Sequence, residues 1–342
     1  MNNEKLVSII TPCFNGEKFV AQYIESVLNQ SYKNIELIII NDGSTDKTEE
    51  VILSYKEKFD KNKSNLVYLK QSANKGQSAA INMGLAVFTG EYMTWADSDD
   101  LLPPNAIKEL VKYLELNPKV GIVKGQSEFV NYDSLEHVYY QIYKFPKNKL
   151  FFSLLECYAP GGYMVRTDMF KQAMQTPLVI ESPREIGQNF QLLLPIAYHF
   201  EAAYILPICY IIRVREGSHS RVKHTYLERI KALEISDKVL SNIVFKFKVC
   251  ELERNKLNRC LLRFHYKRLL AIMLESKVTD NLDEVKKDLI CHNLYNKLSF
   301  RILFYRAKYS WFNFVVKNFY KVYGIHRRIM QIYYVLRYKT KF

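Results

Sequence analysis

The first 125 residues alternate short apolar runs with longer segments in which apolar residues recur at helical spacing. The short runs are rich in branched and aromatic residues, which is typical of buried strands, and the longer segments favour amphipathic helices. Strands are predicted over residues 6–10, 35–40, 66–69, 92–95 and 120–123. Helices are predicted over residues 17–30, 46–59, 78–88 and 105–116. This alternation predicts an α/β fold with parallel strands, right-handed crossovers and helices on both faces of the sheet.

Polar segments follow three of the predicted strands. Thr11-Pro12 ends the first strand, Asp42-Gly43 ends the second, and the acidic segment 97–100 ends the fourth. In an open sheet of this kind, ligands bind outside the carboxyl ends of the strands. We therefore expect the three segments to converge on one crevice, although they are far apart in the sequence.

The acidic run, defined as Asp97-Ser98-Asp99-Asp100, places three carboxylates within four residues. Holding such charges together at the end of a buried strand is costly unless a positive group joins them. Mg²⁺ and Mn²⁺ take oxygen ligands, usually one or two carboxylates together with phosphate oxygens. A solvated acidic turn that caps a helix would explain the same residues, so the run alone leaves both interpretations open.

The composition narrows the class of protein. The 342 residues allow one large domain or two smaller ones, and the hydrophobic fraction of 48% can supply a core. Lys and Arg exceed Asp and Glu by 49 to 35, giving a net charge of +14, which favours nucleic acid, nucleotide or anionic membrane as partner. Six cysteines without a C-x-x-C pair argue against a zinc ribbon or a disulfide framework. No signal peptide or spanning helix is predicted, so we expect a cytoplasmic protein.

Four ordered blocks in the first 104 residues resemble family 2 glycosyltransferases. Residues 8–15 resemble the opening strand of the family, and 26–32 and 36–46 are similar to the segments that follow it. Residues 74–84 are similar to the glycine-containing loop and helix, and 97–100 fall where the family keeps its Asp-x-Asp metal motif. The resemblance implies a GT-A fold, the fold of nucleotide-diphospho-sugar transferases, and a donor that is expected to be a UDP-sugar. It also implies transfer with inversion at the anomeric carbon.

The resemblance assigns the nucleotide to the ends of the first strands. Thr11 and Pro12 would place backbone groups against the base, and Asp42 would accept hydrogen bonds from the uracil or the ribose. The alternative for Asp42 is to cap the turn into the next helix. Gly76 would let the backbone approach the nucleotide, although a plain turn glycine remains an alternative. Many relatives carry Arg where this chain has Ile81, so no nucleotide contact is expected from that side chain.

The resemblance assigns Mn²⁺ or Mg²⁺ to the acidic run. Asp99 is predicted to bind the metal directly, and Asp97 to face the ribose and the metal. Asp100 is expected to cap the following segment.

The acceptor side is expected within residues 126–224, where the pattern departs from the family. An inverting transferase needs a base that takes the proton of the acceptor hydroxyl. Many relatives place this carboxylate in a Glu-Asp pair, but Gln188-Asn189 stands here, and an amide is not a useful base. Glu181 or Glu185 could serve instead, Gln188 and Asn189 could hydrogen-bond the acceptor, or the enzyme could be weak or inactive.

A late segment resembles the His/Ser segment of the family. His219 is a candidate for the metal shell or the diphosphate, and a structural role for it is equally open. Arg215, together with Arg213 or Arg221, could neutralise phosphate charge.

The predicted domains are a GT-A catalytic domain over residues 1–224 and a helical, basic and aromatic region over 225–342. The first is divided into a nucleotide-sugar half, 1–125, and an acceptor half, 126–224. Residues 301–342 contain no Asp or Glu and interleave basic with aromatic residues. This pattern suits an amphipathic helix on an anionic membrane, and a solvated basic face or a homo-oligomer contact are alternatives. No nucleic-acid motif is present, so we expect no nucleic-acid partner.

The sequence thus predicts a metal-dependent transferase that extends a glycan or a lipid-linked acceptor in bacterial surface polysaccharide synthesis, such as capsule synthesis. It is expected to act as a peripheral protein at the inner face of the cell membrane. A non-catalytic nucleotide- or glycan-binding protein on the same fold is the alternative, motivated by the missing base. A nucleotidyltransferase ranks lower, because residues 11–18 do not form the Gly-rich basic loop that it would need.

Overall fold

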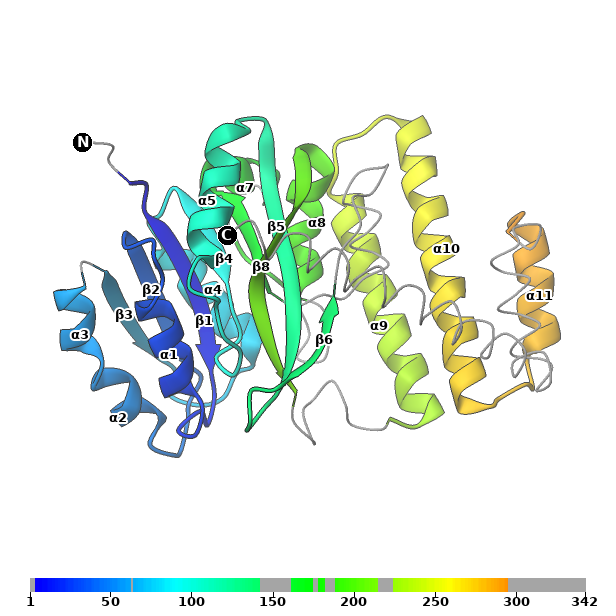
Figure 1. The fold of residues 1–342 in the computed structure, drawn as a ribbon. Coiled ribbons are helices and arrows are strands. Elements are labelled where there is room, and N and C mark those ends of the chain that lie inside the picture. The colour runs from blue at the N-terminus through cyan, green and yellow to red at the C-terminus, as the bar shows by residue number, and fades with distance from the viewer. Residues whose placement is uncertain are drawn as a thin grey trace. The chain divides into compact units, whose positions relative to one another are not determined.

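The computed structural model describes residues 4–62, 64–141, 161–174, 178–181, 188–214 and 224–294. The chain divides into two compact units, Met1–Arg221 and Val222–Phe342, which are described separately (Figure 1). The domain boundary predicted between residues 224 and 225 stays a prediction, because residues 215–223 lie outside the described ranges. The predicted basic and aromatic segment 301–342 also lies outside them.

The first unit is built on a mixed sheet in the strand order β3-β2-β1-β4-β7-β5-β6, with β8 paired to β5. Its strands are β1 (Val7–Cys13), β2 (Ile35–Asn41), β3 (Asn65–Lys70), β4 (Tyr92–Trp95), β5 (Val120–Asn131), β6 (His137–Gln141), β7 (Tyr163–Arg166) and β8 (Glu201–Val214). Strands β3, β2, β1 and β4 are parallel, as the alternation predicts. β5 does not follow β4 directly in the sheet, because β7 lies between them and pairs antiparallel with both.

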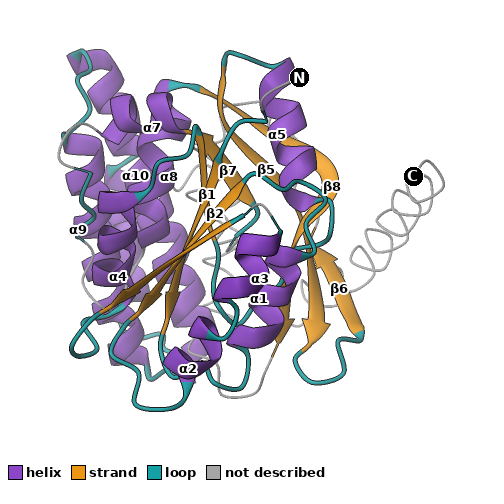
Figure 2. Cartoon of the chain, turned by 90° about the vertical axis from the view of Figure 1, so that its left-hand side faces the viewer, coloured by secondary structure: helices purple, strands orange, loops and turns teal. Residues whose placement is uncertain are grey.

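Helices cover both faces of this sheet. They are α1 (Val20–Leu28), α2 (Thr48–Leu53), α3 (Lys56–Lys61), α4 (Gln77–Val87), α5 (Ala106–Leu116), α7 (Thr167–Met174) and α8 (Gln188–His199). Figure 2 shows α1, α3 and α5 on one side of the sheet and α4, α7 and α8 on the other. The single helix predicted over residues 46–59 is wrong in one respect, because the chain forms two short helices there, α2 and α3.

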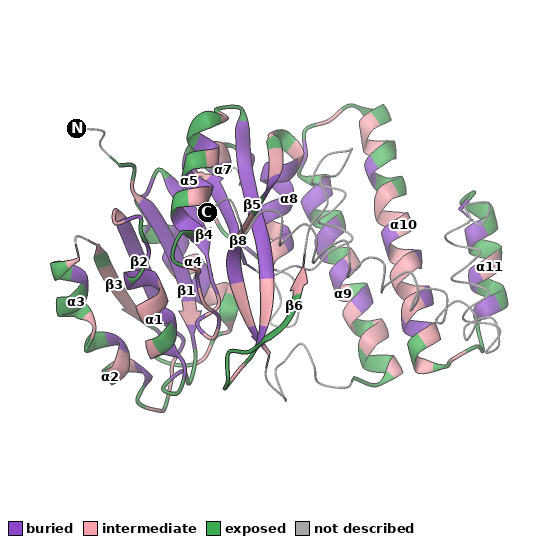
Figure 3. Cartoon of the chain, in the orientation of Figure 1, coloured by how far each residue is buried: buried purple, intermediate pink, exposed green. Residues whose placement is uncertain are grey.

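The core of the first unit lies along the central strands, which are buried on both faces (Figure 3). Every residue of β2 is buried, and the isoleucines at 38, 39 and 40 are fully so. Burying one isoleucine side chain contributes roughly 2–3 kcal/mol to folding. The apolar run that predicts a strand here is therefore also the centre of the core, and it holds the strand ends in fixed positions.

The second unit is helical in its described part, with α9 (Tyr226–Phe245), α10 (Glu251–Ser276) and α11 (Leu282–Cys291). Helix α9 begins with a capping box, in which the Glu228 N–H donates to Thr225 Oγ1 and the Thr225 N–H donates to Glu228 Oε2. Leu270 and Met273 of α10 and Leu289 of α11 are buried in the core of the second unit. Within the described ranges, each helix is too short or too polar to cross a membrane.

Candidate functional site

The ends of β1, β2 and β3 meet at one edge of the sheet. The parallel register places Cys13 opposite Asn41 and Asn41 opposite Lys70, so the loops that follow these strands start side by side. β4 pairs with β1 as far as Trp95, opposite Ile10, and the acidic run follows directly. The structure therefore brings the three predicted polar segments to the same edge.

Asp42 fastens the loop that follows β3. Its Oδ1 accepts the N–H of Lys75 and its Oδ2 accepts the N–H of Gly76, each at 2.8 Å. The side chain is buried, with 3% exposed. The turn into α2 is instead capped by Asn41, whose Oδ1 accepts the N–H of Ser44 at 2.9 Å. Asp42 thus holds a loop across the edge, a role that neither sequence interpretation foresaw.

Glycine is required at two positions beside this contact. Gly43 has φ +70°, and a Cβ there would lie 2.4 Å from the backbone carbon of Ala73. Gly76 has φ +92° and stands directly before α4. Both values lie in the region that side-chain-bearing residues seldom adopt. The two loops consequently pack backbone against backbone, and the start of α4 is fixed.

Thr11 and Pro12 lie inside β1 and not beyond it. The Thr11 side chain is fully buried and its hydroxyl hydrogen-bonds the hydroxyl of Tyr23 on α1. Beyond Ile10, β1 is paired with β2 and no longer with β4. Pro12 has no N–H to donate, and it lies where β1 needs no hydrogen bond to β4. Thr11 is thus fully buried and Pro12 is partly exposed, and Phe14 follows with 44% of its surface exposed.

Asp97 is one of two partly buried carboxylates of the acidic run. Its Oδ1 accepts a hydrogen bond from Gln77 Nε2 at 2.9 Å, and its backbone N–H donates to the Tyr210 hydroxyl at 2.9 Å. Burial, followed by the charge of Asp99, raises the pKa of Asp97 to about 6. The site therefore holds this carboxylate at a cost in free energy, which a cation would offset.

Asp100 faces the protein. It is 5% exposed, and its Oδ1 accepts the backbone N–H of Arg213 on β8 at 2.9 Å. Burial, followed by the charges of Asp97 and Asp99, raises the pKa of Asp100 well above its ordinary value. Asp100 therefore ties the acidic run to β8. We had expected it to cap the segment that follows, and the structure gives it this other role instead. Arg213 also donates to the carbonyl of Asp99 through Nε.

The two carboxylates that are partly exposed are Asp97 and Asp99. In the described part of the chain, no group of three or more histidine, cysteine, aspartate or glutamate side chains is placed to hold a metal ion. Two carboxylates fit a hard cation that takes its other ligands from a diphosphate and water. His219, the third predicted ligand, lies outside the described residues.

The acceptor-side candidates Gln188 and Asn189 are the first two residues of α8, and they contact residues at the edge of the sheet where β1 to β4 end. Gln188 Nε2 donates to Gln77 Oε1, and Asn189 Oδ1 accepts the indole N–H of Trp95 at 3.0 Å. Gln77 is the residue that sequence reasoning missed, although it stands directly after Gly76 in a block that resembles the family. The only local signal for a role at the site was its position as the first residue of α4, close to the ends of the strands.

One of the two candidate bases lies in the described residues. Glu181 is exposed, and its backbone N–H donates to Gln191 Oε1 on α8 at 2.7 Å. The preceding residue, Ile180, is fastened to Asn82 of α4 through its N–H at 2.9 Å and its carbonyl at 3.0 Å. Glu181 is therefore carried by a segment tied to α4 and α8. Glu185 and Arg215 lie outside the described residues.

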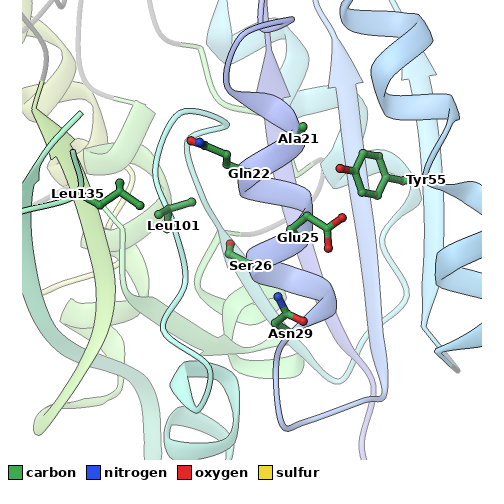
Figure 4. A pocket seen from close by; sticks show the side chains of 8 residues that line it. All are labelled: Ala21, Gln22, Glu25, Ser26, Asn29, Tyr55, Leu101 and Leu135. Atoms are coloured by element: carbon green, nitrogen blue, oxygen red, sulfur yellow. The ribbon is translucent and has the colours of Figure 1, made fainter. Parts of the chain in front are cut away.

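A hollow of about 390 Å³ lies on the outer side of α1 (Figure 4). Its lining residues are Ala21, Gln22, Glu25, Ser26, Asn29, Tyr55, Leu101 and Leu135. The one carboxylate among them, Glu25, accepts a hydrogen bond from Lys58 at 2.8 Å. No member of the acidic run lines it, so we place the candidate site at the strand ends and not in this hollow.

The sheet order, the covering helices and the acidic run at the end of β4 define a GT-A fold. Residues 8–173, just under half of the chain, match the family model described as Glycosyl transferase family 2, and this segment belongs to that family. The predictions of family and fold are confirmed.

Relatives support the family over part of their length. An uncharacterized glycosyltransferase of Rickettsia typhi is 39% identical over 153 residues, which cover 44% of this chain and 45% of the relative. Glycosyltransferase GlyA of Streptococcus pneumoniae is 27% identical over 234 residues, which cover 63% of this chain and 32% of the relative. The chain thus spans less than half the length of these curated relatives.

Solved structures resemble the chain over most of its length. TarS 1–349 of S. aureus, in complex with UDP-GlcNAc, superposes with a TM-score of 0.62 at 18% identity, covering 87% of this chain and 90% of that one. The mannosyltransferase PcManGT of Pyrobaculum calidifontis, in complex with GDP-Man and Mn²⁺, gives 0.55 at 16% identity, covering 94% and 88%. At these identities the likeness supports the fold.

Proposed function

We propose that this chain is a metal-dependent inverting glycosyltransferase. It moves a sugar from a nucleotide-diphosphate donor, a UDP-sugar, to a glycan or lipid-linked acceptor in bacterial surface polysaccharide synthesis. The observation that carries the proposal is that three parts of the chain lie together at one edge of the sheet. They are the acidic run with Asp97 and Asp99, the loop held by Asp42, and the start of α8 at Gln188. TarS in complex with UDP-GlcNAc and PcManGT with Mn²⁺ support a donor and a cation of this kind.

On the donor side, Asp99 is proposed as a direct ligand of Mn²⁺ or Mg²⁺, with Asp97 toward the ribose and the metal. The bound cation would neutralise the departing diphosphate. Backbone groups of Thr11 and Pro12 would contact the base. Asp42, whose carboxylate can accept more hydrogen bonds than the two it receives, would add a contact to the base or ribose.

On the acceptor side, Glu181 or Glu185 is proposed as the base that takes the hydroxyl proton as the new bond forms. Gln188 and Asn189 would hydrogen-bond the acceptor or hold it in place, since their amides are not bases. Arg215 and His219 remain proposals for the diphosphate and the metal. The alternative is a non-catalytic nucleotide- or glycan-binding protein, and the observation that favours it is the amide pair at 188 and 189.

A lipid-linked acceptor would bring the chain to the inner face of the membrane. The turn between α9 and α10 supports such a contact, because Phe245 is 80% exposed and Leu252 is 68% exposed there. Lys246 and Lys248 lie exposed in the same turn. Exposed apolar side chains with basic neighbours suit an anionic interface.

The test compares wild-type chain with Asp99→Ala in binding and turnover. Thermal shift with UDP, GDP and their sugars, with and without Mn²⁺, should show a metal-dependent rise for one nucleotide, because a ligand of the native state stabilises it. We expect Asp99→Ala to lose that rise and the transfer. Asp133→Ala, an exposed carboxylate in the β5–β6 turn, serves as the matched control.

Retained turnover in Asp99→Ala would contradict the metal assignment. Metal-dependent nucleotide binding without transfer or donor hydrolysis, across the full sugar panel, would favour the binding protein over the enzyme. Release of UDP or GDP by the purified chain would remove that alternative.

A further inference from the structure

Two glutamine side chains form a bridge from the acidic run to α8. Gln77 Nε2 donates to Asp97 Oδ1 at 2.9 Å, and Gln77 Oε1 accepts a hydrogen bond from Gln188 Nε2. Gln77 is the first residue of α4 and Gln188 is the first residue of α8. The bridge therefore connects the first turns of two helices with the carboxylate that follows β4.

The Gln77 end of the bridge starts from a fixed backbone. The N–H groups of Lys75 and Gly76 donate to the two carboxylate oxygens of Asp42. Gly76 adopts φ +92°, so the chain enters α4 through a turn that favours glycine. The Gln77 amide thus reaches Asp97 from a rigid support.

The Gln188 end is held at a second point. Asn189 Oδ1 accepts the indole N–H of Trp95 at 3.0 Å. Trp95 is the last residue of β4 and lies two residues before Asp97. Helix α8 therefore contacts this part of the chain through two successive amides, Gln188 and Asn189.

The bridge has a direction, because an ionised carboxylate accepts hydrogen bonds and donates none. Asp97 orients the Gln77 amide with its NH₂ group toward the carboxylate and its carbonyl toward Gln188. Gln188 must then supply a donor, which an amide has and a carboxylate lacks. The amide side chain at 188 is therefore matched to Gln77.

We propose that Gln77 and Gln188 are positioning residues that hold Asp97 in the orientation needed for the metal–nucleotide donor and keep the start of α8 beside it. The inference rests on the proposed function and gives the amide at 188 a role on the donor side. Hydrogen bonds to an ionised acceptor are shorter and stronger than those between neutral groups. The loss of the hydrogen bond from Gln77 to Asp97 should therefore be measurable as weaker binding of the donor nucleotide.

The test is a double-mutant cycle in the full chain, with UDP or GDP, whichever the wild type binds, and Mn²⁺ as probes. Calorimetry gives the Kd of the nucleotide, and initial rates separate kcat from KM. We expect Gln77→Ala to weaken Mn²⁺-dependent binding by about tenfold. Gln188→Ala should weaken it by about threefold in the wild-type background and not at all in Gln77→Ala, because the second residue acts through the first.

The direction of the bridge is tested with Gln188→Glu, which keeps the size of the side chain. It sets two acceptors against each other, so we expect a loss of affinity at least as large as that of Gln188→Ala. Gln172, an exposed glutamine on α7, supplies matched controls. Gln172→Ala and Gln172→Glu should bind nucleotide and Mn²⁺ as the wild type does.

Independent losses in the cycle would overturn the bridge, and so would wild-type affinity in Gln188→Glu. Equal unfolding temperatures for all variants, together with the expected losses, would support positioning over a general effect on folding. A wild-type chain that binds neither UDP nor GDP with Mn²⁺ would overturn the proposed function itself. The wild-type measurement thus separates the two failures.

Discussion

The three carboxylates of the acidic run contact different groups, and each therefore affects the stability of the folded protein differently. Asp100 is turned into the protein and accepts the backbone N–H of Arg213. Asp97 accepts from Gln77 and stays partly exposed, as does Asp99. The charge of Asp99 contributes to the raised pKa of both neighbours. The three carboxylates together therefore reduce the stability of the metal-free protein at neutral pH.

We predict that Asp99→Asn stabilises the metal-free protein by about 1 kcal/mol at neutral pH, a rise of roughly 2–4 °C in Tm. The pKa of Asp97 is raised from 3.8 to about 6 in the folded state, so its ionisation opposes folding. That cost is absent below about pH 4 and complete above about pH 6. The gain from removing the Asp99 charge should follow the same window, as thermal unfolding across this pH range will show.

Asp133→Asn is the control for this experiment, because Asp133 is exposed and outside the acidic run. Its Tm should follow that of the wild type at each pH. A gain for Asp99→Asn that persists unchanged at pH 3 would contradict the electrostatic explanation.

Whole elements were predicted well where local pattern determines them. The apolar run at 35–40 gave β2, and the turn residues after it gave the start of a crossover helix. The placement of β7 could not be predicted, because Met93 pairs with Val165 far along the chain and no local periodicity encodes that partner. Register between distant strands depends on which buried faces complement each other, which the sequence pattern alone leaves open.

The candidate site shows the same limit. Strand ends bring Asp42 and Asp97 to one edge, and this convergence followed from topology. Gln77 was missed because its partners are 20 and 111 positions away, at Asp97 and Gln188. A polar residue at a helix start predicts an exposed surface position until its neighbours are known.

We predict that Asn82→Ala loosens the segment that carries Glu181. Asn82 of α4 exchanges two hydrogen bonds with the backbone of Ile180, at 2.9 and 3.0 Å. Losing both should cost about 1–3 kcal/mol locally, so hydrogen exchange at the amides of Ile180 and Glu181 should accelerate by about tenfold or more. Exchange measured by mass spectrometry on peptides covering 178–181 will report this.

Asn105→Ala, at an exposed asparagine before α5, should leave exchange in residues 178–181 unchanged. Equal protection of this segment in Asn82→Ala and the wild type would show that other contacts hold it.

For the molecule as a whole, the net charge of +14 and the exposed apolar turn between α9 and α10 lead to a membrane prediction. We expect the full chain to float with vesicles of anionic phosphatidylglycerol and not with neutral phosphatidylcholine. Binding should weaken strongly between about 50 and 500 mM salt, because screening shortens the reach of surface charge. Phe245→Ala with Leu252→Ala should reduce binding by about fivefold, since both side chains lose apolar area.

Leu116→Ala removes a side chain that is 72% exposed on α5, and it should bind vesicles as the wild type does. Equal flotation of this control and the Phe245/Leu252 double variant, both reduced or both unchanged, would argue against a specific role for the α9–α10 turn.

Asp42 has a consequence for inferring donor identity from sequence. Its two oxygens accept the N–H groups of Lys75 and Gly76, contacts that involve only the protein. A transferase that had changed its nucleobase preference would still need the aspartate to keep that loop in place. An aspartate at this position is therefore evidence for the architecture of the edge, and it carries little information about whether uracil or guanine is the base.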